Sequence, residues 1–96
     1  MTKLSDEQIQ AALADIPEWS EVGGALQRTY LLADFDAAME FVGRVAEIAK
    51  QDDHHPDILI RYNKVTLTLA THDAGGITNK DFAQARAIDG FVPARA

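Results

Sequence analysis

Histidine side chains are the residues of this sequence best suited to acid–base chemistry. The chain has three, His54, His55 and His72, and all of them fall between positions 54 and 72. Because the ordinary pKa of imidazole is about 6.5, a histidine can give up or accept a proton near neutral pH. One protonated and one neutral imidazole could donate a proton to a leaving hydroxyl and accept another from a ring nitrogen. This group therefore predicts a histidine-lined acid–base pocket. Dehydration is a reaction that such a pocket could carry out without a cofactor.

The proline that follows the first two histidines predicts how they point. Pro56 biases His55 away from helical backbone and toward extended backbone. Consecutive residues of an extended segment point in opposite directions. We therefore expect His54 and His55 to reach different walls of the site and to have different roles.

The third histidine ends a predicted strand. From Val65 to His72 apolar and polar residues alternate, which places His72 on the polar face with Thr66, Thr68 and Ala70. A hairpin that turns at Asn63-Lys64 would bring this strand back alongside residues 58–62. We therefore expect the three imidazoles to converge at one edge of a β-sheet.

A metal site is the main alternative use of these histidines. Three histidines can hold zinc, and Asp52, Asp53 or Asp57 could add an oxygen ligand. Adjacent histidines on extended backbone diverge, however, and the helical His-x-x-x-His spacing is missing. We therefore expect no metal. The simplest alternative for any single histidine is a half-exposed polar residue without a catalytic role.

Helix caps, turn residues and apolar periodicity predict the elements that position these residues. Capping boxes at Ser5-x-x-Gln8 and Thr78-x-x-Asp81 open the first and last helices, and Asp34 caps a helix over residues 35–50. Four strands are predicted, at 19–22, 26–32, 58–62 and 65–71. The order α-β-β-α-β-β-α predicts a single α+β domain over residues 1–96, with a four-stranded antiparallel sheet and helices packed on one face.

The middle helix has a wider apolar surface than one sheet face should need. Its periodic stripe consists of Phe35, Ala38, Met39, Val42, Val45, Ala46 and Ala49. Phe41 and Ile48 widen that stripe. The helix is broadly buried in the core, or its extra apolar strip contacts another subunit, or both.

Composition narrows the class of partner. The formal net charge is −6 and the nine basic residues are scattered, which argues against nucleic acid. No apolar run approaches the roughly 20 residues of a membrane span, and the N-terminus lacks a secretion signal. The chain has no Cys, so it has no disulfide and no Cys-based zinc site. We expect a cytoplasmic protein that binds a small neutral ligand or another protein.

A set of residues at fixed spacing runs through the histidine stretch. It consists of His54-His55-Pro56, Tyr62, Asn63-Lys64-Val65, Thr71-His72, Gly76 and Asp81. Their identity and spacing resemble the signature of the pterin-4a-carbinolamine dehydratases, and the resemblance extends along most of the chain. One position is less typical: the residue four before the first histidine is often Glu in that family and is Lys50 here.

The resemblance implies an activity and a role for each site residue. The family removes water from 4a-hydroxytetrahydropterin to give quinonoid dihydropterin, and so recycles the cofactor of aromatic amino acid hydroxylases. By this resemblance His54 and His72 act as proton donors and acceptors, and His55 binds and orients the pterin. Asp81 matches the family's motif aspartate, which binds substrate or supports the site, although its capping box alone would explain an acid there.

The resemblance also implies partners, and it leaves two alternatives open. It implies a homodimer or homotetramer associated through helices, and an aromatic amino acid hydroxylase as a functional partner. Relatives that pair with transcription factors make a regulatory binding module the first alternative, with the strip of Phe41, Val45 and Ile48 as the feature that would support it. The second alternative is action on a molybdopterin-related pterin.

Overall fold

The computed structural model describes residues 2–91 of the chain. Three α-helices and a four-stranded antiparallel sheet follow one another in the order α-β-β-α-β-β-α, so the predicted fold class is confirmed. The elements are α1 (Asp6–Leu13), β1 (Ser20–Val22), β2 (Ala25–Leu31), α2 (Phe35–Asp52), β3 (Asp57–Arg61), β4 (Lys64–Leu69), a short 3-10 helix η1 (His72–Ala74) and α3 (Asn79–Asp89). No helix within residues 2–91 has both the length and the apolar composition that crossing a membrane requires.

The predicted capping residues set where the three helices begin. Ser5 and Gln8 make both bonds of a capping box at the start of α1. Asp34 accepts a hydrogen bond from the Ala37 N–H at the start of α2. Thr78 and Asp81 form the second capping box at the start of α3. Each contact satisfies an N–H group that a helix start leaves without a partner, so these boundaries depend on local sequence.

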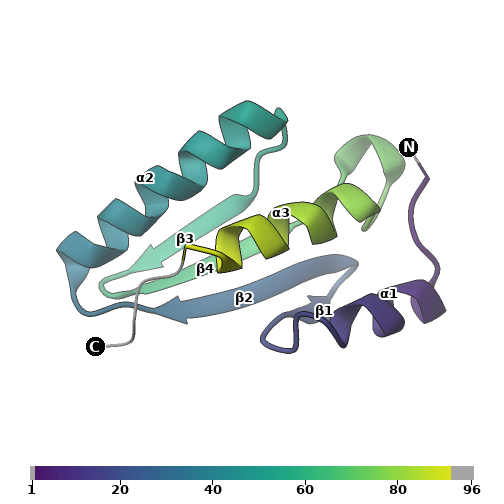
Figure 1. Cartoon of the computed structure of the whole chain (residues 1–96), viewed down its shortest axis with the longest axis horizontal. Helices are drawn as coiled ribbons and strands as arrows, with labels where there is room; N and C mark the ends of the chain where they lie inside the picture. Colours follow the sequence, from purple (N-terminus) through teal and green to yellow (C-terminus); the bar gives the residue numbers. More distant parts are fainter. Residues whose placement is uncertain (1, 92–96) are drawn as a thin grey trace.

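The sheet has one face covered by helices and one without them. Its strand order is β1-β2-β4-β3, and every neighbouring pair is antiparallel. Figure 1 shows α2 and α3 lying across the same face. Alternate residues point toward these helices and form the core, among them Leu26, Tyr30, Val65, Leu67 and Leu69. The intervening residues lie on the opposite face, called here the open face.

The turn between β3 and β4 lies one residue earlier than predicted. Arg61 pairs with Lys64, so Tyr62 and Asn63 make the turn instead of Asn63-Lys64. Tyr62 has a positive φ of 54° and its side chain is 67% exposed. The Asn63 side chain donates a hydrogen bond to the Leu32 carbonyl at 3.0 Å, and the Asn63 carbonyl accepts one from the Leu32 N–H at 2.8 Å. These bonds to the end of β2 explain why the turn is centred there.

The face of α2 that enters the core contains part of the predicted stripe, namely Ala38, Val45 and Ala49, together with Phe41. Ala38, Phe41, Val45 and Ala49 are buried, at spacings of three and four residues that form one row on the helix. Phe41 and Val45 therefore belong to the core and are not available to another subunit. The exposed apolar row is the adjacent one, in which Phe35 is 46% and Met39 is 42% exposed. This row continues through the half-buried Val42 and Ala46 and is called here the α2 stripe.

A partly buried polar cluster anchors the end of α3 to the sheet. The Asp89 carboxylate accepts hydrogen bonds from the Tyr30 hydroxyl at 2.7 Å, the Arg28 guanidinium at 2.8 Å and the Trp19 indole N–H at 3.0 Å. Burial raises the pKa of the Tyr30 hydroxyl far above its ordinary value, and the hydrogen bond to Asp89 raises it further. The folded protein therefore holds Tyr30 in its neutral form.

This cluster predicts a loss of stability in alkaline solution. The unfolded chain ionises Tyr30 above its ordinary pKa of 10.0, whereas the folded chain does not, so the free energy of unfolding should fall as pH rises above that value. Tyr30 should contribute a loss of about 1.4 kcal/mol per pH unit above pH 10. Urea unfolding at pH 8 and pH 11 measures it, with Tyr30→Phe expected to reduce the difference. Tyr62→Phe, at an exposed tyrosine, is the matched control.

Candidate active site

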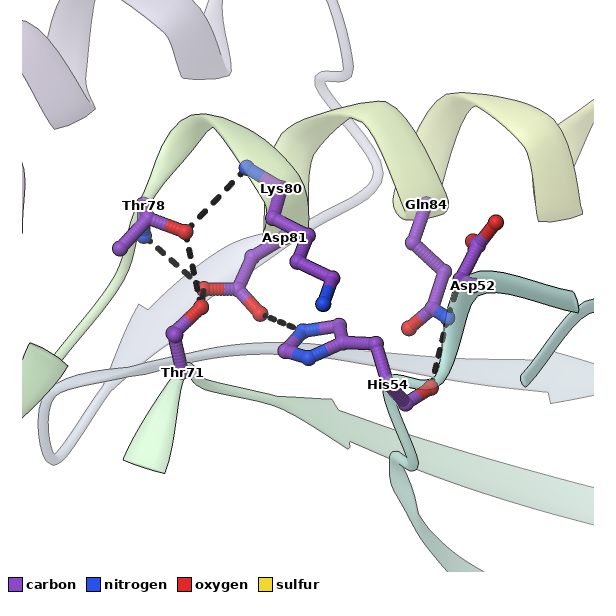
Figure 2. A network of polar contacts seen from close by, with 7 residues as sticks. All are labelled: Asp52, His54, Thr71, Thr78, Lys80, Asp81 and Gln84. Carbon is purple, nitrogen blue, oxygen red and sulfur yellow. Dashed lines mark hydrogen bonds and ion pairs between the residues drawn. The ribbon is translucent and has the colours of Figure 1, made fainter. Parts of the chain in front are cut away.

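The first histidine forms a buried pair with the motif aspartate. His54 follows α2 directly and is 8% exposed, and Asp81 in the first turn of α3 is 0% exposed. The Nε2 atom of His54 lies 2.5 Å from Oδ1 of Asp81, across a sequence separation of 27 residues. Figure 2 shows the second ring nitrogen of His54 on the side away from Asp81. A carboxylate held at one ring nitrogen orients an imidazole and selects its tautomer, which leaves the other nitrogen for proton exchange.

The second oxygen of the aspartate closes the capping box. Oδ2 of Asp81 accepts hydrogen bonds from the Thr78 backbone N–H and from the Thr71 hydroxyl, both at 2.9 Å. The Thr71 and Thr78 hydroxyl oxygens are 2.7 Å apart. The capping role and the histidine contact are therefore not alternatives, because each uses its own carboxylate oxygen (Figure 2). With both oxygens engaged and no exposed surface, Asp81 acts on the site through His54 and the cap.

A buried glutamine binds the backbone of His54. Its role is not predicted from the sequence. Gln84 is 1% exposed, and its amide Nε2 donates to the His54 carbonyl at 2.8 Å and to Oδ2 of Asp52 at 3.3 Å. Asp81 and Gln84 are three residues apart on α3 and therefore lie on the same side of the helix. Asp81 contacts the ring of His54, and Gln84 binds its carbonyl. A polar residue on the buried side of α3 was the available signal, but its partner could not be read from the sequence.

The other two histidines share a pocket on the open face. His55 and His72 line a cavity of about 270 Å³ together with Asp57 and Thr68, and Ala25 and Ala70 complete its wall. Asp57 and Thr68 are directly paired across β3 and β4, which places both side chains on the same face. The cavity volume is just below the range of about 300–1,000 Å³ usual for small-molecule sites. Larger hollows near the start of α1 and at the β3–β4 turn contain no histidine.

The structure thus places two of the three histidines in one cavity and the third in contact with the start of α3. His54 and His55 diverge as expected for neighbours before Pro56, with the ring of His54 toward α3 and the ring of His55 in the pocket. The expected convergence of side chains is found for His55 and His72. His54 is not among the residues that line this cavity, but its partner Asp81 also accepts a hydrogen bond from Thr71, the residue before His72. The hairpin returns the strand as predicted, but β4 ends at Leu69, so His72 begins η1 and does not end the strand. It lines the cavity on the open face from there.

Two pocket residues were not singled out as ligand-binding residues by sequence reasoning. The sequence suggests Asp57 only as a metal ligand. Its pairing with Thr68, which lies on the same strand face as the predicted position of His72, explains why it lies beside His72.

Within residues 2–91, no group of three His, Cys, Asp or Glu side chains is placed to hold a metal ion. The polar groups of the pocket can instead exchange protons with an organic ligand and bind its N–H groups.

Comparison with known proteins identifies the family. The family model described as pterin 4 alpha carbinolamine dehydratase matches residues 2–91. A protein of Thermomicrobium roseum is 53% identical over 92% of this chain and 95% of its own length, and one of Chloroflexus aurantiacus is 54% identical over 93% and 96%. Both are named as candidate pterin-4-alpha-carbinolamine dehydratases.

A solved structure agrees with these relatives. A crystal structure from Brucella melitensis, described as a transcriptional coactivator/pterin dehydratase, superposes with a TM-score of 0.91 and 32% sequence identity. The match covers 96% of this chain and 100% of that one. The chain therefore belongs to the pterin 4 alpha carbinolamine dehydratase family, whose named enzymes are hydro-lyases.

Proposed function

We propose that this protein removes water from 4a-hydroxytetrahydropterin to give quinonoid dihydropterin. The observation that carries the proposal is the pocket in which His55 and His72 lie together at the end of β4. The carboxylate-bound His54 immediately precedes His55 in the chain. The relatives at about half identity bear the name of this activity, which supports the same assignment for this chain.

The reaction needs one proton given and one proton taken. As the bond between C4a and its hydroxyl breaks, an imidazolium donates a proton and the hydroxyl leaves as water. A neutral imidazole takes the proton from N5, and the electron pair of that N–H bond forms the C4a=N5 double bond. We assign these two acts to His54 and His72. His55 binds and orients the pterin from the pocket wall.

The role of Asp81 in this proposal is to support His54. Its carboxylate is buried, and both oxygens already have protein partners, so a direct contact with substrate would require displacing one of them. Holding Nε2 of His54 leaves Nδ1 as the atom that exchanges a proton. In this proposal Asp81 positions the ring of His54 and does not bind the substrate directly.

The charges of the pocket favour one of the two pterin classes. No Lys or Arg is among the residues that line it, and its one carboxylate belongs to Asp57. A phosphate group would lack a Lys or Arg partner there, whereas an uncharged pterin would not need one. We therefore propose a biopterin-type substrate over a molybdopterin-related one, in a reaction that returns the pterin cofactor of an aromatic amino acid hydroxylase for reduction.

A direct assay tests the activity. The 4a-hydroxypterin is generated in solution by a hydroxylase, and its absorbance is followed with and without the purified protein at neutral pH. The signal should disappear faster in proportion to protein concentration. A rate equal to that in buffer would reject the proposal. A parallel assay with a phosphate-bearing pterin, expected to be slower, tests the choice of substrate.

Assembly through α2 is the part of the proposal that concerns other copies of the chain. Phe35 and Met39 of the α2 stripe expose apolar side chains four residues apart on one side of the helix. The structural relative from Brucella melitensis is described as a transcriptional coactivator as well as a dehydratase. We propose that this stripe is the contact between subunits of a homodimer or homotetramer, and the surface that a regulatory partner would use if there is one.

A charge placed in the stripe should separate the subunits. Met39→Glu is expected to give monomers in light scattering, because the contact would have to bury an unpaired carboxylate. Gln51→Glu adds the same charge at an exposed position of α2 outside the stripe and should leave the assembly unchanged. If Met39→Glu retains the wild-type mass, the stripe is not the subunit contact. Far-UV circular dichroism confirms that both variants are folded.

A further inference from the structure

The polar groups of the histidine pocket are of two kinds, placed side by side. The imidazoles of His55 and His72 can exchange protons, whereas the Asp57 carboxylate can only accept hydrogen bonds when ionised. Thr68 adds a hydroxyl, and the rest of the wall is methyl groups of alanine. Because no Lys or Arg is among the lining residues, an ionised Asp57 favours N–H donors over anions in this pocket.

Asp57 is held at the wall of the pocket by the sheet. It is the first residue of β3 and is paired with Thr68 on the open face, so it is carried by the sheet and not by a loop. None of the ion pairs among residues 2–91 involves it. The neighbouring Thr68 hydroxyl oxygen accepts a hydrogen bond from Nε2 of Gln27 at 3.2 Å, which leaves the hydroxyl hydrogen to donate. A carboxylate acceptor and a hydroxyl donor thus lie next to each other.

This pair complements the pyrimidinone ring of a pterin. The 2-amino group and N3–H of that ring present two parallel donors, and the carbonyl oxygen at C4 follows them on the same edge. A carboxylate accepts two parallel N–H groups in bidentate geometry, which is both stronger and more directional than a single neutral hydrogen bond. The adjacent hydroxyl can donate to the carbonyl oxygen.

We propose that Asp57 is a specificity-determining residue that binds the 2-amino and N3–H edge of the pterin, with Thr68 beside it. The proposal rests on the proposed function, since it names how that substrate is held. The carboxylate fixes the pyrimidinone ring at one side of the cavity and leaves the hydroxylated side of the ligand to the imidazoles. Ligands that carry an oxygen in place of the 2-amino group lose a donor and bind less well.

Two ligands that differ only at this group test the proposal. Binding of pterin and of lumazine, its 2-oxo counterpart, is measured by fluorescence quenching with the wild-type protein and with Asp57→Asn. The wild type should prefer pterin. Asp57→Asn should bind pterin about 10- to 100-fold more weakly, the range expected for hydrogen bonds to a charged group. Its preference for pterin over lumazine should disappear, since an amide can donate to the 2-oxo group.

A matched variant and two contrary outcomes distinguish a failure of the proposed Asp57 contact from a failure of the proposed dehydratase activity. Asp36→Asn removes the same charge from the first turn of α2, away from the pocket, and should change neither affinity. If Asp57→Asn keeps the wild-type preference, the inference is wrong, even if turnover falls, because Asp57 then acts on the imidazoles and not on the ligand edge. If the wild-type protein neither binds pterin nor accelerates dehydration, it is the proposed function that fails.

Discussion

Alanine at His54 or at His72 should lower dehydratase turnover by about 10²- to 10⁴-fold, the range typical of general acid–base groups. Alanine at His55 should raise KM more than it lowers kcat. The two large losses are expected because the imidazoles of His54 and His72 each move a proton in the step that breaks the C4a–oxygen bond. His55 shares the pocket with His72 but serves to bind the ligand. Steady-state kinetics with hydroxylase-generated substrate separate the two effects.

The comparison between His54 and His55 is the sharpest part of this prediction. Only His55 and His72 line the cavity, while the ring of His54 is buried against Asp81. If His55→Ala loses kcat and His54→Ala keeps it once folding is verified, the acid–base pair is His55 with His72, and His54 is structural. Replacement by Gln, which retains hydrogen bonding but cannot exchange protons near neutral pH, should be as damaging as Ala at a true acid–base position.

The parts of this fold that sequence reasoning predicted are those decided by neighbouring residues. The Ser5 and Thr78 capping boxes and the Asp34 cap each involve groups within a few positions of one another. Strand alternation from Val65 onward was readable for the same reason. These local signals were enough for the element order and hence for the fold class.

The parts that could not be predicted depend on which surfaces meet. Apolar residues surround much of α2, so its period alone did not decide whether Phe41 or Met39 faces the core. The structure buries Phe41 and leaves Met39 exposed. The contact of His54 with Asp81 joins residues far apart in sequence. Whether an imidazole faces α3 or the open face follows from that packing and not from the histidine motif.

Asparagine at Asp81 should lower turnover about as much as alanine at His54, while leaving the protein folded. The amide oxygen can still accept from the Thr78 N–H and the Thr71 hydroxyl, so the cap at the start of α3 survives. The amide NH₂, however, can only donate to Nε2 of His54, which forces the proton onto Nδ1. The imidazole is then held in the tautomer opposite to the one that the carboxylate selects.

Alanine at the same position should instead act on stability. It leaves His54, Thr71 and the Thr78 N–H without their buried partner. Removing one member of a buried pair costs about 3–5 kcal/mol. Gln8→Ala is the matched control, because Gln8 occupies the same place in the α1 capping box but lies outside the site. It should cost about 1 kcal/mol and leave kcat unchanged. Urea unfolding and steady-state kinetics on each variant measure both quantities.

A double-variant cycle decides whether the aspartate works through the histidine. If Asp81 acts only by orienting His54, then Asp81→Asn added to His54→Ala should lower kcat no further, because the group that it orients is already gone. Multiplicative losses would mean that Asp81 contacts the substrate itself, which is one of the two roles that the family resemblance left open. Since Asp81 is 0% exposed and both of its oxygens are occupied, we expect the two losses not to multiply.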